Sequence, residues 1–306
     1  MNKRNSRSKT MVYDPEVGDL VEEQVFGGSF LNVVYHFYDT TLGKLLYNMI
    51  FKKKWFSSLY TLRMYSPRSK RLIKAFVTDY DLNLDEVEKP LDSYETMNEF
   101  FIRKLKPTAR PIDPSPELLI SPADSRLLIY HIDHNLVLPV KGKSFSIVKL
   151  LNDADLAASF FNGTCAVFRL APIDYHRFCY IDHGHQSPVR AINGDLHSVS
   201  PIALHRLIPV FRENYRELCV LDTNNFGEVI HLDVGAITVG RITQHQMEAG
   251  PMTKGQEKGY FQFGGSTIVL LFKAGTVCFD EVIRGHSNKG IEVLVKYGQA
   301  IGKKRT

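Results

Sequence analysis

The chain has 306 residues, of which 44% are hydrophobic and 23% charged, and this ordinary globular composition excludes an extensively disordered protein. The formal net charge of +5 permits an anionic partner, but no arginine-rich arm, RNP motif or Cys/His finger spacing is present, so a nucleic-acid partner is disfavoured. The four cysteines, Cys165, Cys179, Cys219 and Cys278, include no CxxC pair, which suits a reducing compartment and predicts no metal site.

The N-terminal third is predicted to be helical. We expect a flexible N-terminus over residues 1–20 and a helical region over 21–112. No secretory signal and no run of about 18 apolar residues is present, so the sequence predicts no membrane-spanning helix. Three lysines, Lys52 to Lys54, precede Trp55 and Phe56, a pattern typical of an interfacial membrane anchor. The alternative is a solvated helix end beside a tryptophan packed in the core.

Two further segments of this region carry helical periodicity. Residues 67–80 and residues 93–106 each place apolar side chains on one face, and Pro107 ends the second segment. Ser93, with Thr96 three residues on, is a weak candidate for its N-cap.

From Leu118 onwards, short β-type runs alternate with Gly, Pro, Asn and Asp. Only residues 147–161 interrupt them with a helical pattern. Many short strands separated by turn signals predict a sandwich or barrel-like body over residues 113–306. The predicted fold class is therefore α+β, with an N-terminal amphipathic helical layer packed on an antiparallel β core.

The segment Lys254 to Phe272 carries the most distinctive chemistry. Two glycines, Gly264 and Gly265, precede Ser266 between two β-type runs. The serine hydroxyl could attack the preceding carbonyl in an N→O acyl shift, and β-elimination of the resulting ester would release Gly265 as a new C-terminus. The dehydroalanine left behind would hydrolyse to a pyruvoyl group. The alternative is a plain hairpin turn, because glycines supply positive φ and the hydroxyls bond locally.

Six segments in order resemble those of the phosphatidylserine decarboxylase family, over about residues 20 to 300. They are FFIRKLKPTARPID (100–113), SPADSRL (121–127), KGKSFSIVKLL (141–151), RLAPIDYHRF (169–178), VGAITVGRI (234–242) and KGQEKGYFQFGGST (254–267). The resemblance is closest to the shorter bacterial members.

This resemblance implies a proenzyme that cleaves itself between Gly265 and Ser266, giving a β chain of residues 1–265 and an α chain of residues 266–306. It implies a covalent pyruvoyl group derived from Ser266, which forms a Schiff base with phosphatidylserine and releases CO₂ to give phosphatidylethanolamine. It also implies a homodimer, a peripheral location at the cytoplasmic face of the cell membrane, and an anionic membrane surface as partner.

The resemblance assigns three site residues. Ser266 is the nucleophile of maturation, Asp124 in SPADSR corresponds to an aspartate that orients an imidazole, and His176 in DYHR corresponds to the catalytic histidine. Considered alone, Asp124 could instead cap a turn after Pro122, and His176 could be a structural residue.

The chain departs from the family at one position. Many members carry a second histidine three residues after the first, where this chain has Cys179. A cysteine acts as a base only if its pKa is lowered. The maturation base is therefore His176, His183 or His185, of which we favour His176.

The substrate phosphate has three candidate partners, Arg169, Arg177 and Lys254. Surface solvation is the more ordinary expectation for each of these side chains.

Two other functions remain open at this point. A pyruvoyl-dependent decarboxylase of the same fold could act on a soluble amino acid, and an uncleaved homologue could be a non-enzymatic membrane-binding protein. A Ser-His-Asp hydrolase is disfavoured because no G-x-S-x-G motif is present.

Overall fold

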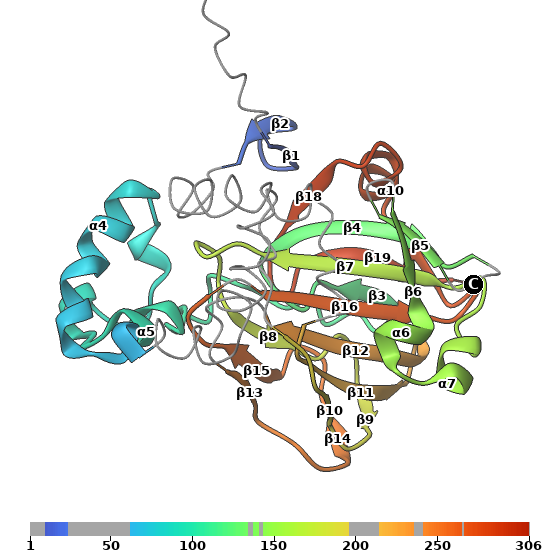
Figure 1. Cartoon of the computed structure of the whole chain (residues 1–306). Coiled ribbons are helices and arrows are strands. Elements are labelled where there is room, and N and C mark those ends of the chain that lie inside the picture. Colours follow the sequence, from blue (N-terminus) through green and yellow to red (C-terminus); the bar gives the residue numbers. More distant parts are fainter. Residues whose placement is uncertain are drawn as a thin grey trace, which may run out of the picture.

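The computed structural model describes residues 10–23, 62–133, 137–140, 143–195, 214–235, 241–264 and 266–305, with the backbone alone for 137–140 and 143–145. Its centre is an eleven-stranded sheet (Figure 1). The strands follow the order β14 (Gly250–Met252), β9 (Gly184–Gln186), β11 (Arg216–Thr223), β12 (Gly227–Gly235), β16 (Ser266–Phe272), β7 (Thr164–Leu170), β4 (Ser125–His131), β18 (Glu292–Val295), β1 (Met11–Asp14) and β2 (Asp19–Glu22), with β10 (Arg190–Ile192) paired beside β11. The pairs are antiparallel except for β1 with β18.

Both faces of this sheet are covered, which explains why its central strands are apolar throughout. Side chains alternate between the faces, so Ile268 and Leu270 of β16 enter one core and Val269 and Leu271 enter another. The second core is closed by two short helices, α6 (Ile147–Leu151) and α7 (Ala154–Ala158).

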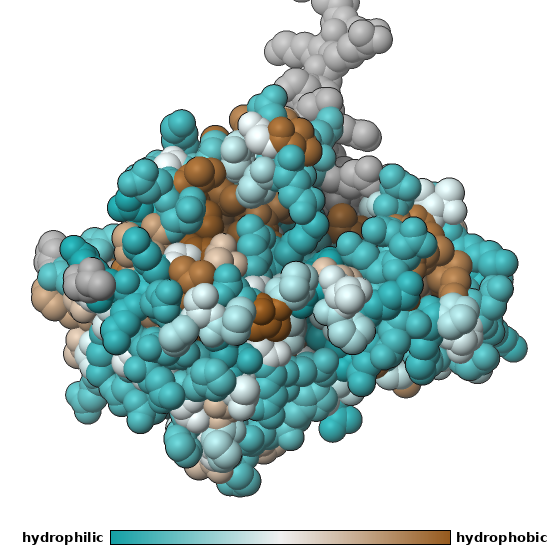
Figure 2. Space-filling view, turned by 180° about the vertical axis from the view of Figure 1, so that it is seen from behind, coloured by the Kyte–Doolittle hydropathy of each residue, from teal (hydrophilic) through white to brown (hydrophobic). Residues whose placement is uncertain are grey.

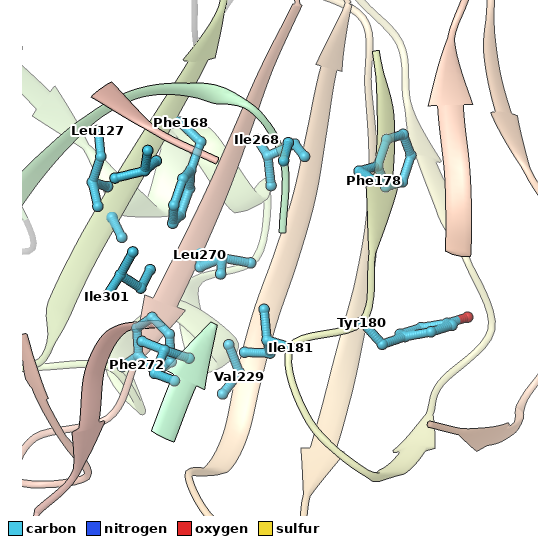
Figure 3. Packing of buried hydrophobic residues seen from close by; sticks show 14 of the residues in the cluster. Leu127, Phe168, Phe178, Tyr180, Ile181, Val229, Ile268, Leu270, Phe272 and Ile301 are labelled. Atoms are coloured by element: carbon cyan, nitrogen blue, oxygen red, sulfur yellow. The ribbon is translucent and has the colours of Figure 1, made fainter. Parts of the chain in front are cut away.

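The first core lies between the main sheet and two smaller three-stranded sheets. These are β13 (Ile242–Gln244), β15 (Glu257–Phe261) and β8 (Arg177–Cys179), and β17 (Val277–Phe279), β19 (Ala300–Lys304) and β3 (Leu118–Ile120). In Figure 3, Phe178 and Ile301 of the smaller sheets point into the same core as Phe168 and Leu270 of the main sheet. A two-stranded ribbon, β5 (Val137–Val140) and β6 (Lys143–Ser146), completes the strands.

A helical unit lies at one end of the main sheet (Figure 1). It contains the 3₁₀ helices η2 (Pro67–Lys70), η3 (Leu84–Glu86) and η4 (Leu91–Ser93) and the helices α4 (Arg71–Asp79) and α5 (Met97–Phe101). Its own apolar cluster includes Phe76, Phe100 and Phe101, and also Phe263 from the segment that precedes β16. The helical unit therefore packs directly on the segment that the sequence singles out for cleavage.

The fold class is confirmed, since helices pack on large antiparallel sheets, and the helical segment over 67–80 is observed as η2 and α4. The helix predicted over 93–106 is shorter than expected. Thr96 caps it by accepting a hydrogen bond from Glu99 N, and it ends at Phe101. Beyond that point Leu105 forms a β-bridge with Val87, so a tertiary pairing overrides the helical pattern.

Two other expectations are wrong. The N-terminus is not flexible over the whole of 1–20, because β1 and β2 form a hairpin and β1 adds to the edge of the main sheet. The β body also contains an additional helix, α10 (Glu281–Asn288), which Asp280 caps. Residues 24–61 of the expected helical region, which include the cluster Lys52 to Phe56, lie outside the described residues.

None of the helices in the described part of the chain combines the length and the apolar character needed to cross a membrane.

Candidate active site

Ser266 is the first residue of β16, where it pairs with Gly235 of β12 on one side and Leu170 of β7 on the other. Its side chain is fully buried, and its Oγ has no hydrogen-bond partner within the part of the chain that the structure describes. A buried hydroxyl without a partner is costly, so such a group points to a chemical role. Gly264 has a φ of 142°, which side chains rarely adopt, and this explains the need for glycine before the cleavage site. Gly265 itself lies outside the described residues.

His176 lies in the connection from β7 to β8, at the same end of the sheet as Ser266. Its backbone carbonyl accepts a hydrogen bond from Phe261 N at 2.9 Å, which ties it to the strand that leads to Ser266. The Nδ1 atom lies 3.0 Å from the carbonyl oxygen of Asp174, and because a carbonyl only accepts, Nδ1 carries the proton. Nε2 therefore presents a lone pair, and no hydrogen bond to this buried atom is formed by the described residues. This is the tautomer that a general base requires.

The imidazole of His176 is held neutral. Burial, to which the positive charges of Arg103 and Arg126 add, lowers the pKa of His176 to about 3. The carbonyls of Asp174 and Gly264 act in the opposite direction and are outweighed. The ring stacks against Phe101 of α5, with 4.0 Å between the ring centroids. His176 is thus a base that is shielded from water and packed against the aromatic ring of Phe101.

Asp124 is held by partners other than the histidine. Its carboxylate accepts hydrogen bonds from Nε and Nη2 of Arg110 at 2.9 and 2.7 Å, and from Tyr297 N at 2.7 Å. Among the described residues, no hydrogen bond joins Asp124 to His176. The carbonyl of Asp174 occupies the orienting position that was predicted for Asp124, so a role for Asp124 toward the imidazole stays a prediction.

The alternatives to His176 as the maturation base lose support. Burial raises the pKa of Cys179 to about 12, so this side chain is a thiol and not a thiolate. His183 and His185 are exposed, and His185 pairs with Asp222 at the end of the sheet opposite to Ser266. At 3.3 Å per residue, the strand register separates the two ends by roughly 20 Å.

The three candidate phosphate partners are interior residues, so the expectation of surface solvation is wrong. Lys254 donates to the carbonyls of Ser115 and Leu118, at 2.5 and 2.8 Å. Arg177 bonds Glu257 at 2.6 Å. Arg169 pairs with two glutamates, described below. All three are less than 10% exposed.

Five residues around the site had no role in the sequence prediction. Asn98 accepts a hydrogen bond from Phe263 N at 3.0 Å, Phe101 stacks on His176, and Arg103, Arg110 and Tyr297 complete the surroundings of His176 and Asp124. Three of these, Phe101, Arg103 and Arg110, lie in the family-like segment 100–113. This motif was the available signal that these residues have a role. Their contacts could not be predicted because their partners are distant in the sequence.

The described residues hold no group of three or more His, Cys, Asp or Glu side chains placed to bind a metal ion.

Comparisons with known proteins identify the family of the chain. The sequence model of the family described as Phosphatidylserine decarboxylase matches residues 97–303. The phosphatidylserine decarboxylase proenzyme of Clostridium perfringens (strain SM101 / Type A) is 41% identical over 297 residues, covering 97% of this chain and 98% of that protein. That of Ruminiclostridium cellulolyticum is 40% identical over 292 residues, covering 95% of this chain and 96% of that protein. Phosphatidylserine decarboxylase proenzyme 2 of Clostridium acetobutylicum is 42% identical over 292 residues, with coverages of 95% and 98%. Because the family model spans most of the chain and the relatives match it almost end to end, this chain belongs to the phosphatidylserine decarboxylase family of carboxy-lyases.

Proposed function

We propose that the chain is a phosphatidylserine decarboxylase proenzyme, which cleaves itself between Gly265 and Ser266 and then converts phosphatidylserine to phosphatidylethanolamine and CO₂. One observation carries the proposal: Ser266 Oγ and His176 Nε2 are both buried at the same end of the sheet, and neither has a hydrogen-bond partner among the described residues. A hydroxyl nucleophile needs a nearby base, and a neutral imidazole with a free lone pair supplies one.

The surroundings of Ser266 fit a pyruvoyl group made from that residue. The side chain already occupies a fully buried position at the start of β16, so a carbonyl formed there would be shielded from water. Once formed, the group supplies an electron sink for the loss of the substrate carboxylate. Within this chain, His176 can move a proton at Nε2, and the Asp174 carbonyl keeps its ring in place. We assign Asp124 a supporting role at the same site.

A membrane surface is the proposed partner because the substrate is a lipid. We assign the contact to the helical region that follows β2 and extends to residue 112. Its described part exposes Leu62, Tyr65 and Leu84, at 66%, 40% and 39%. Hydrophobic side chains gather in patches on the face shown in Figure 2. By family resemblance, we also propose a homodimer located peripherally at the cytoplasmic face of the cell membrane.

Intact-mass spectrometry and a denaturing gel test the maturation. The expected products are fragments 1–265 and 266–306, the second with a blocked N-terminus. The variant Ser266→Ala should remain one uncut, inactive chain. Thr267→Val is a matched control, because it removes the neighbouring buried hydroxyl, which also lacks a partner. This hydroxyl lies on the opposite face of β16, so the control should still cleave.

The substrate class is tested by comparing phosphatidylserine vesicles with free serine. Release of CO₂ from the vesicles alone is expected. Turnover of free serine at a similar rate would favour a decarboxylase of soluble amino acids. A purified wild-type chain with a single intact mass would favour the uncleaved, non-enzymatic alternative.

A further inference from the structure

Arg103 is a buried cation without an ion-pair partner in the described part of the chain. The residue is 7% exposed, and its guanidinium lies over the ring of Phe100, 5.1 Å from the centroid. Nη2 donates to the carbonyl of Ile173 at 3.2 Å, and no described residue forms a hydrogen bond with Nη1. No carboxylate among the described residues forms an ion pair with it. Burial lowers the pKa of Arg103, which shows that its surroundings disfavour the positive charge.

An uncompensated buried charge is expensive, by several kcal/mol or more, so a fold retains one where it meets an opposite charge at some stage. Three other arginines of the site region have such a partner: Arg110 pairs with Asp124, Arg126 with Asp174 and Arg177 with Glu257. Among these four described arginines, Arg103 is the one that remains available to an anion formed or bound at this site.

Arg103 follows α5, in the helical unit that packs on the segment to be cleaved. The apolar cluster of this unit includes Phe263, and Asn98 of α5 holds Phe263 N. The charge of Arg103 and the carbonyl of Gly264 both act on the same imidazole, that of His176. Gly265, which lies outside the described residues, is bonded to Gly264.

Self-cleavage creates an anion in that region. After the acyl shift, Ser266 Oγ is esterified by the Gly265 carbonyl carbon. In the elimination, a base takes the Cα proton of Ser266 and the C–H electron pair forms the Cα=Cβ double bond. The Cβ–Oγ bond then breaks, and its electrons stay on Oγ. This oxygen leaves as part of the Gly265 carboxylate, so a full negative charge develops away from water.

We infer that Arg103 stabilises the departing Gly265 carboxylate during the elimination step of maturation and remains its counter-ion in the mature protein. The inference rests on the proposed self-cleavage. A preorganised cation at the position where charge develops accelerates a reaction more than it stabilises the ground state. The carboxylate of the substrate is a poorer candidate, because a cation that stabilises it would oppose its loss as CO₂.

The experiment separates the acyl shift from the elimination. Full-length chains of wild type, Arg103→Met, Arg103→Lys and the control Arg216→Met are made by pulsed in vitro translation. Their cleavage is then followed on denaturing gels with and without hydroxylamine. Hydroxylamine attacks the ester directly and splits the chain without elimination. Arg216 is a suitable control because it is buried and donates to the backbone carbonyls of Lys149, Leu150 and Asn214.

We expect Arg103→Met to cleave spontaneously at least about 100-fold more slowly than wild type, the effect of removing one stabilising donor. With hydroxylamine it should cleave at nearly the wild-type rate, giving a fragment 266–306 with an ordinary N-terminal serine. Arg103→Lys should recover part of the spontaneous rate, and Arg216→Met should behave as wild type.

Three outcomes would overturn the inference. Spontaneous cleavage of Arg103→Met at the wild-type rate, with a raised KM for phosphatidylserine, would assign Arg103 to the substrate phosphate. Wild-type cleavage with unchanged KM would leave it no functional role. Failure to cleave even with hydroxylamine would place its effect before the ester forms. By contrast, a wild-type chain that never cleaves would refute the proposed function itself.

Discussion

Replacing Glu23 with glutamine tests whether the N-terminal hairpin is part of the catalytic body. Glu23 directly follows β2, and only 2% of its side chain is exposed. Its Oε1 lies 2.8 Å from Arg126 Nε, and its Oε2 lies 2.8 Å from Arg169 Nη2. These two arginines are direct cross-strand neighbours in β4 and β7, so their like charges repel each other. Glu23 bridges the two and reduces this repulsion.

The magnitude follows from what each arginine retains. Removing one partner from a buried ion pair costs ~3–5 kcal/mol. Arg126 also pairs with Asp174, and Arg169 with Glu292. Since neither arginine is left without a counter-ion, we expect Glu23→Gln to lower the free energy of unfolding by about 3 kcal/mol, the lower end of that range.

Glu16→Gln is the matched control from the same hairpin. The Glu16 and Lys296 side chains form an ion pair and are 69% and 46% exposed. An exposed pair contributes ~0–1 kcal/mol, so this variant should unfold almost as wild type does.

Urea unfolding followed by circular dichroism measures both variants, in a Ser266→Ala background that keeps the chain in one piece. The slope of the free energy of unfolding against urea concentration should be the same in all variants, so that a shift in the midpoint reports stability alone. If Glu23→Gln lost no more stability than Glu16→Gln, the hairpin would not be anchored through this carboxylate, and the reasoning would fail.

Three further predictions concern maturation. The cleavage rate should stay nearly constant from pH 8 to pH 5 in a stopped time course, because the pKa of His176 is about 3 and the base form persists. If the base were a histidine with the ordinary pKa of 6.5, the cleavage rate would fall roughly 30-fold at pH 5. Such a fall would contradict the assignment of buried His176 as the base. Cys179→Ala should cleave within about threefold of wild type, because a thiol with a raised pKa contributes no base. A 100-fold loss on a gel would make Cys179 a participant. Asn98→Leu should slow cleavage about tenfold or more, because an unsatisfied buried Phe263 N–H costs ~1–3 kcal/mol. Asn98→Asp retains the acceptor oxygen and should cleave close to the wild-type rate, and equal rates for both variants would refute the anchoring role.

The sequence by itself determined the fold class and singled out Ser266 as the proposed nucleophile. Alternating and continuous apolar runs report local burial, so the strands around Ser266 were predictable from their own residues. The glycine requirement was also visible, since Gly264 has a backbone conformation that other residues rarely adopt. The helix over 93–106 and the flexible N-terminus were predicted less well, because strand pairing with distant segments decided both.

Only the tertiary structure decided how the charges are arranged. Arg169 pairs with Glu23 and Glu292, which are 146 and 123 residues away, and no local pattern encodes such partners. The neutral state of His176 likewise depends on burial beneath Phe101, which outweighs the opposing effect of the Asp174 carbonyl. The same side chains on a surface would be solvated and would keep their ordinary pKa values. Their chemistry changes because folding removes water from around them, and the sequence does not reveal which groups lose that water.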